Sequence, residues 1–167
     1  MKELELKLIA ELMKNSRRSD RELGRALGAS QPTVTRIRRK LEKEGIIKEY
    51  TMIPDFAKLG YELMNVTFIN IKKSTPKELE QAREGAAEEV NKKVFPDLLI
   101  ERGLGLGFDG VIITLHRNYT DYTEQLKYTR TRPFVQPNHV ESFLVNLEDQ
   151  THYRSLTLSL VADDLVK

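Results

Sequence analysis

Cationic and hydroxyl side chains gather between residues 30 and 44, at spacings that place them along one side of a helix. Arg and Lys neutralise phosphates and reach guanine edges in the major groove. Hydroxyl and amide groups contact phosphates or base edges near a helix N-terminus. The pattern favours binding of double-stranded DNA, and an ordinary solvated basic helix is the alternative. The candidate contact residues are Arg21, Ser30, Gln31, Thr33, Thr35, Arg36, Arg39, Lys40 and Lys43.

Two helices joined by a tight turn would position these side chains. Ser19 and Glu22 have the spacing of a capping box, and Gly28 can end the first helix with a positive φ. Ser30 is the N-cap expected for the second helix, Gln31–Glu44. The buried stripe of that helix, with apolar residues three and four apart, is Val34, Ile37 and Leu41. The arrangement predicts a helix-turn-helix, in which Arg36 and Arg39 are the first candidates for base contacts.

The charge of the chain is unevenly distributed. Residues 1–50 hold 13 Lys+Arg against 8 Asp+Glu, whereas the rest of the chain is net negative within an overall charge of +2. A basic N-terminal part suits a polyanion and the acidic remainder does not. No apolar run approaches the ~20 residues of a membrane span, and we expect no signal peptide before the first helix. We therefore expect no membrane partner, and a DNA-binding role implies a cytoplasmic, nucleoid-associated protein of a prokaryote.

The run from Lys7 to Gly60 resembles the DNA-binding half of the leucine-responsive regulator (Lrp/AsnC) family of bacteria and archaea. The resemblance is carried by Leu23, Leu27, Gly28, Ser30, Val34, Arg36, Ile37, Leu41, Glu42, Gly45, Ile47, Tyr50 and Leu59–Gly60. It implies that Gln31–Glu44 enters the major groove, and that the protein is a homodimer or a dimer-based higher oligomer. We expect a strand at about Glu49–Ile53 that pairs with its copy in a second chain.

The rest of the chain predicts a second domain of the α+β class. Its expected strands are Leu63–Lys72, Leu98–Arg102, Val111–Arg117, Val140–Leu147 and Leu156–Val161, with helices at about 75–94 and Thr120–Tyr128. The order is β-α-β-β-α-β plus a final strand, which is the ferredoxin-like arrangement. The same order follows the DNA-binding half in the Lrp/AsnC family, as an ACT-like effector module. We therefore expect a winged-helix-like domain over 1–50, a linker over 51–62 and an effector and oligomerisation domain over 63–167.

A glycine-rich turn between two expected strands leaves several interpretations open. Gly105, Gly107 and Gly110 spell G-x-G-x-x-G, but a strand follows instead of the helix that a dinucleotide site needs. One interpretation is a plain hairpin turn. The other, supported by the family resemblance, is an amino-acid effector site in which backbone amides hold a carboxylate and an Asp holds an ammonium. The effector candidates are Gly105, Gly107, Phe108 and Asp109.

The pattern of chemically reactive residues does not favour an enzyme. The three His residues have no metal-ligand spacing and Cys is absent, so we expect neither a metal nor another cofactor. Each His is expected at a polar surface or interface. His152-Tyr153-Arg154 is the only cluster that hints at the related tetrapyrrole decarboxylases of the same layout. A metabolite-sensing module with vestigial DNA binding is the other alternative.

Overall fold

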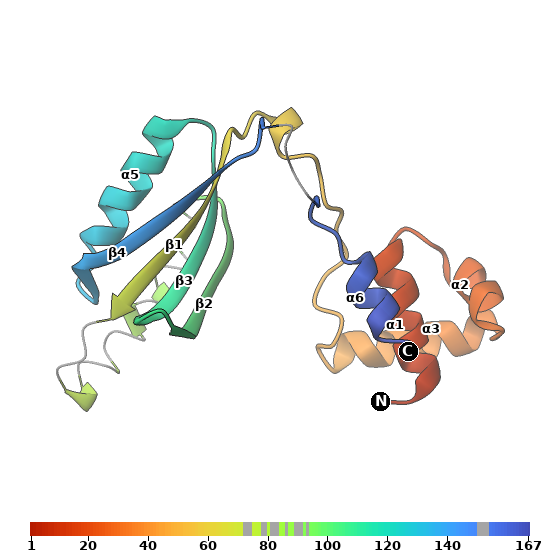
Figure 1. The fold of residues 1–167 in the computed structure, drawn as a ribbon. Coiled ribbons are helices and arrows are strands. Elements are labelled where there is room, and N and C mark those ends of the chain that lie inside the picture. The colour runs from red at the N-terminus through yellow and green to blue at the C-terminus, as the bar shows by residue number, and fades with distance from the viewer. Residues whose placement is uncertain are drawn as a thin grey trace. The chain divides into compact units, whose positions relative to one another are not determined.

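The computed structural model describes residues 1–71, 75–77, 80, 84–85, 87–88, 92, 94–149 and 154–167. The chain divides into two compact units (Figure 1). One, here called the N-terminal unit, combines Met1–Pro54 with the C-terminal residues from 154 onwards. The other, here called the sheet unit, begins at Asp55 and contains the four-stranded sheet. The fold is α+β, as the sequence predicts.

The N-terminal unit is built from helices around one apolar core. Its elements are α1 (Glu3–Lys14), α2 (Asp20–Leu27), α3 (Gln31–Lys43) and α6 (Ser159–Asp164). Leu8, Leu23, Val34 and Leu41 are fully buried, with Leu12 beside them. These residues include two of the three predicted for the stripe of α3, and Ile37 packs against them half-buried. The helix-turn-helix is therefore held by the contacts that the apolar spacing predicts.

Local capping defines the turn between α2 and α3. Ser19 and Glu22 form the predicted capping box, and Ser30 Oγ accepts from the backbone N–H of Thr33 at 3.3 Å. Gly28 ends α2 with φ 64°, a conformation that costs glycine little. Gly24 is required for a different reason, since a Cβ there would lie 2.7 Å from the carbonyl oxygen of Ala29. Any larger residue at position 24 would push the turn away from α2.

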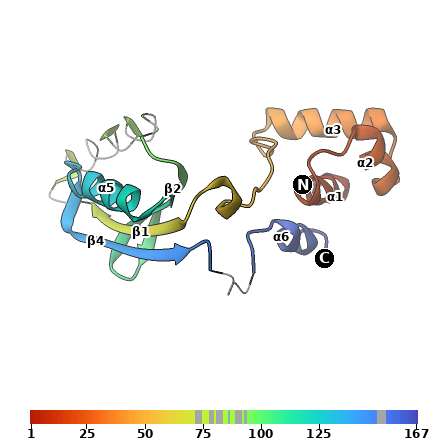
Figure 2. The same ribbon diagram turned by 90° about the horizontal axis from the view of Figure 1, so that it is seen from above.

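The C-terminal segment corrects the strand predicted at Leu156–Val161. Residues 154–157 are irregular and α6 follows, packed on α1 within the N-terminal unit (Figure 2). Ala162 of α6 is fully buried, and Asp163 pairs with Lys14 at 2.7 Å. Apolar residues alternate with polar ones along Leu156–Val161, as in a strand, but side chains such as Leu156 and Leu160 stay largely exposed. The segment therefore belongs to the N-terminal unit, and not to the effector domain expected over 63–167.

The sheet unit has the predicted ferredoxin-like topology. Its strands are β1 (Leu63–Ile71), β2 (Asp97–Gly105), β3 (Phe108–His116) and β4 (Val135–Asn146). They form an antiparallel sheet in the order β2-β3-β1-β4, and α5 (Tyr119–Arg130) covers one face of it (Figure 1). A 3-10 turn, η1 (Ala57–Leu59), precedes β1. The helix predicted at about 75–94 lies largely outside the described residues.

The start of β4 and the strand predicted at about Glu49–Ile53 also differ from the sequence prediction. β4 runs from Val135 to Asn146 and contains Pro137, so it begins before the strand predicted at Val140–Leu147. The strand lies at the edge of the sheet and its register with β1 shifts between Ile69 and Ile71, so Pro137 removes no regular ladder bond. Residues 49–53 form no strand, because no described segment of the same chain pairs with them.

The sheet face under α5 is partly polar. Asn65, Thr67, Thr114 and His116 are all buried, and Asn65 Nδ2 donates to Thr67 Oγ1 at 2.6 Å. His116 Nε2 lies 2.8 Å from Thr114 Oγ1. Burial lowers the pKa of His116, against an opposing effect of Asp121. His116 is therefore a core residue, and the prediction that it lies at a polar surface or interface is wrong.

Candidate nucleic-acid interface

One side of α3 presents cations that have no internal partners among the described residues. Arg36, Arg39 and Lys43 are exposed, and no hydrogen bond or ion pair to their side chains occurs among the described residues. Their spacing of three and four residues aligns them along the helix. Arg21 on α2 is likewise exposed and has no such partner in the described part of the chain. These four side chains are available for an anionic ligand.

Hydroxyl groups at the start of α3 interact with each other. Ser30 Oγ lies 2.8 Å from Thr33 Oγ1 in addition to capping the helix. Gln31, the first residue of α3, is exposed. Backbone N–H groups of a first helical turn and the helix dipole attract phosphate. The start of α3 therefore has the chemistry that phosphate or base-edge contacts need.

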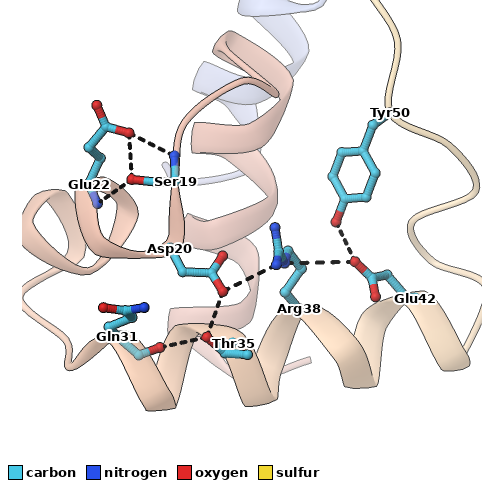
Figure 3. A network of polar contacts seen from close by, with 8 residues as sticks. All are labelled: Ser19, Asp20, Glu22, Gln31, Thr35, Arg38, Glu42 and Tyr50. Carbon is cyan, nitrogen blue, oxygen red and sulfur yellow. Dashed lines mark hydrogen bonds and ion pairs between the residues drawn. The ribbon is translucent and has the colours of Figure 1, made fainter.

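Thr35 is directed towards α2 and is already bonded. Its hydroxyl lies 2.6 Å from Asp20 Oδ2 and 3.0 Å from the carbonyl oxygen of Gln31 (Figure 3). The Asp20 side chain is only 10% exposed, so this contact lies between the two helices. Thr35 is thus a predicted DNA contact whose hydroxyl instead joins α3 to α2.

Lys40, another predicted contact residue, also has an internal partner. Its Nζ lies 2.7 Å from Glu5 Oε1, and Glu44 Oε1 lies 3.8 Å away. The hydrogen bond from Lys40 is the main reason that the pKa of Glu5 is lowered, and the same bond raises the pKa of Lys40. Because the Glu5 side chain is nearly inaccessible, the pair joins α1 to α3.

The inner side of α3 carries a polar network that was not predicted from the sequence. Arg38 Nη2 lies 3.2 Å from Asp20 Oδ2, and Arg38 Nε lies 3.8 Å from Glu42 Oε1. Tyr50 Oη donates to the same Glu42 oxygen at 2.7 Å (Figure 3). Burial, followed by Glu42, raises the pKa of Tyr50 to about 12. The spacing of Arg38 and Glu42, four residues apart on a helix, was the available signal for part of this network.

The glycine-rich segment is a two-residue hairpin turn between β2 and β3. Gly105 pairs with Phe108, and Leu106 and Gly107 have φ values of 53° and 81°. The plain-turn interpretation describes this geometry, and β3 follows where a dinucleotide site would need a helix. Asp109 Oδ2 accepts from the backbone N–H of Ile71 at 3.1 Å. This carboxylate therefore also holds the end of β1.

A cavity of about 260 Å³ lies elsewhere in the sheet unit. Its walls combine apolar side chains such as Ile100 and Phe134 with the polar Asp97, Gln125 and Thr129. The described residues contain no cluster of His, Cys, Asp or Glu that could hold a metal ion. Nor is any helix of the described part long and apolar enough to cross a membrane.

Comparison with known proteins relates the N-terminal unit to DNA-binding regulators. Residues 1–48 match the winged helix-turn-helix DNA-binding family. Over 70 residues the chain is 44% identical to the HTH-type transcriptional regulator LrpC of Bacillus subtilis, covering 42% of this chain and 49% of LrpC. Over 69 residues it is 32% identical to the leucine-responsive regulatory protein of Rhizobium meliloti, covering 41% of this chain and 44% of that protein. The matches thus span about half the length of these curated relatives.

Solved structures extend the similarity to the fold of nearly the whole chain. Bacillus subtilis LrpC aligns with a TM-score of 0.69 at 24% identity, over 91% of this chain and 99% of LrpC. Escherichia coli AsnC aligns with a TM-score of 0.69 at 19% identity, over 93% and 97%. The L-Met complex of the regulator NMB0573 from Neisseria meningitidis aligns with a TM-score of 0.73 at 22% identity, over 96% of this chain and 99% of that one. The predicted resemblance to the Lrp/AsnC family and the α+β fold are confirmed.

Proposed function

We propose that this protein is a sequence-specific DNA-binding transcriptional regulator of the Lrp/AsnC type, acting in the cytoplasm of a prokaryote. One observation carries the proposal: Arg36, Arg39 and Lys43 are exposed along one side of α3 without internal partners among the described residues. This is the side that a recognition helix presents to the major groove. The matches to transcriptional regulators support the same role.

The nine predicted contact residues differ in whether their side chains can reach DNA without breaking an internal bond. Arg36 and Arg39 are proposed to read base edges or hold phosphates, and Lys43 and Arg21 to hold phosphates. Gln31, Ser30 and Thr33 lie at the helix start, where they can reach the DNA backbone or a base edge. Thr35 and Lys40 are proposed to act through their bonds to Asp20 and Glu5, because a DNA contact would compete with those bonds.

Fluorescence anisotropy with the protein's own promoter DNA and with random duplex tests the proposal. We expect tighter binding to the promoter, and a steep fall of affinity with salt because phosphate contacts release counterions. Equal and weak binding to both duplexes, unchanged by the Arg36→Ala/Arg39→Ala double substitution, would contradict it. That result would favour the alternative of a metabolite-sensing module.

We also propose that the protein acts as a homodimer or a dimer-based higher oligomer. The segment after α3 exposes four large apolar or aromatic side chains to solvent: Ile46, Tyr50, Met52 and Ile53. The same residues line a groove of the N-terminal unit. A second copy would cover this surface and place two recognition helices about 34 Å apart, one turn of DNA. Sedimentation equilibrium of the wild type and of Met52→Asp tests this, with a shift towards monomer expected.

An amino acid or related small metabolite is the proposed effector of the sheet unit. A structural neighbour, the NMB0573 regulator, is described as a complex with L-Met. The candidate residues remain Gly105, Gly107, Phe108 and Asp109 at the hairpin turn, although Asp109 also holds Ile71. Calorimetry with a panel of amino acids, on the wild type and Asp109→Asn, tests the site. Retained binding in the variant would exclude Asp109 as the ammonium partner.

A further inference from the structure

The inner side of α3 carries a continuous path of polar contacts that the proposed DNA contacts do not use (Figure 3). Asp20, the first residue of α2, bonds both Thr35 and Arg38. Glu42 Oε1 faces Arg38 at 3.8 Å and accepts from Tyr50 at 2.7 Å. Asp20, Arg38, Glu42 and Tyr50, here called the clamp, thus join α2, α3 and the segment that follows α3.

The position of Tyr50 gives the clamp its significance. Tyr50 lies in the irregular segment between α3 and Pro54, the last residue of this part of the N-terminal unit. That segment leads along the chain to β1 of the sheet unit. Any displacement of the segment therefore acts on Glu42, and through Glu42 on Arg38.

The clamp is not fully bonded in this structure. Asp20 Oδ1 and Arg38 Nε are both buried and lack a hydrogen bond among the described residues. A guanidinium can hold a carboxylate through two parallel bonds, but here only Nη2 lies within bonding distance of Asp20. Asp20 and Glu42 thus share one Arg38. An arrangement in which Arg38 binds Asp20 through both nitrogens would satisfy the two buried atoms and release Glu42.

We infer that Arg38 and Tyr50 are positioning residues for DNA recognition, which set the orientation of α3 against α2 and couple it to the segment leading to the sheet unit. This inference rests on the proposed function. A recognition site must be held within a fraction of an ångström, so the contacts that fix the helix contribute to selectivity without touching the DNA. Arg38 differs in this from Arg36 and Arg39, its neighbours on the exposed side.

The contact between Tyr50 and Glu42 is tested without DNA. Tyrosine-ring NMR is recorded during an alkaline titration of the whole chain. The pKa of Tyr50 is expected at about 12 in the wild type. In Glu42→Gln the pKa should fall part of the way towards the ordinary value of 10.0, because the charged acceptor is lost while the burial remains. A wild-type Tyr50 that titrates at the ordinary value, or a Glu42→Gln variant with no change, would overturn the clamp.

The positioning role is tested on DNA with Tyr50→Phe and Arg38→Gln. Each is expected to lower the affinity for the preferred duplex about three- to tenfold, the loss that a single hydrogen bond produces. Affinity for random duplex and the salt dependence should stay unchanged. Lys43→Ala, a proposed phosphate contact, should instead weaken binding to all sequences and reduce the salt slope by about one. Tyr61→Phe, which removes a tyrosine hydroxyl in the sheet unit, is the matched control.

The outcomes separate this inference from the proposed function. A wild type that prefers no duplex contradicts the proposed function itself. A selective wild type whose Tyr50→Phe variant keeps its full selectivity contradicts the positioning role alone. If Arg38→Gln reduces the salt slope as Lys43→Ala does, Arg38 is a phosphate contact and the inference is overturned.

Discussion

Lys40 Nζ lies 2.7 Å from Glu5 Oε1, and this ion pair joins α3 to α1, the first helix of the chain. Glu5 also accepts from the backbone N–H of Lys2 at 2.8 Å, so the same carboxylate caps α1. A cation that the sequence assigns to DNA is therefore part of the scaffold. The pair also makes the stability of the N-terminal unit depend on pH.

Acid is expected to weaken this unit through Glu5. The pKa of Glu5 is lowered from 4.5, chiefly by its bond to Lys40, so its stabilising effect is complete above that value and is lost as the pH falls through the lowered one. Glu5→Gln should lower the free energy of unfolding at pH 7. The difference from the wild type should shrink in strong acid. Urea unfolding at both pH values measures it, and a difference that does not depend on pH would contradict the assignment.

Arg36→Ala is expected to weaken specific DNA binding by about 1–3 kcal/mol if Arg36 reads a guanine. The side chain is exposed and lacks an internal partner in the described structure, so protein stability should not change. Anisotropy titrations on preferred and random duplexes measure the effect. Arg102→Ala, which removes an exposed cation from β2, is the control. An equal loss on every sequence would make Arg36 a phosphate contact.

Ala162→Asp is expected to detach α6 from α1. Ala162 is fully buried, and an unpaired carboxylate there would cost about 3 kcal/mol or more. Hydrogen exchange should then rise in α1 while the sheet unit stays protected. Val161→Asp, at a neighbouring position that is 53% exposed, is the control and should have little effect. Unchanged protection of α1 in Ala162→Asp would show that α6 contributes nothing to the unit.

Leu106→Asn is expected to stabilise the hairpin turn of the sheet unit. Leu106 has φ 53° and is 85% exposed. Its left-handed backbone therefore destabilises the turn, and burial of the side chain offsets little of that effect. Asn tolerates this conformation, and the gain should be about 0.5–1 kcal/mol. Thermal unfolding of Leu106→Asn is compared with Leu104→Asn, whose backbone is not left-handed. Equal effects of the two substitutions would attribute the gain to polarity and not to backbone relief.

The sequence predicts the fold where neighbours along the chain determine it. Ser19, Gly28 and Ser30 act on N–H and C=O groups within a few residues, so their motif identifies the helix ends directly. Runs rich in Val, Ile and Phe similarly identify β1 and β3, which lie in the middle of the sheet. Leu156–Val161 shows the limit of sequence patterns, because its alternation of apolar and polar residues occurs where the chain forms a turn and a helix.

By itself, the sequence determined the helix-turn-helix, the positions of the four strands along the chain and the basic side of α3, because each depends on residue types and spacing over short stretches. Only the tertiary structure decided that Lys40 meets Glu5, that Thr35 and Arg38 meet Asp20, and that α6 packs on α1. Lys40 and Glu5 are separated by 35 residues, and Lys14 and Asp163 by far more. Such contacts depend on how whole helices pack, so which cations remain free for DNA follows from the folded arrangement.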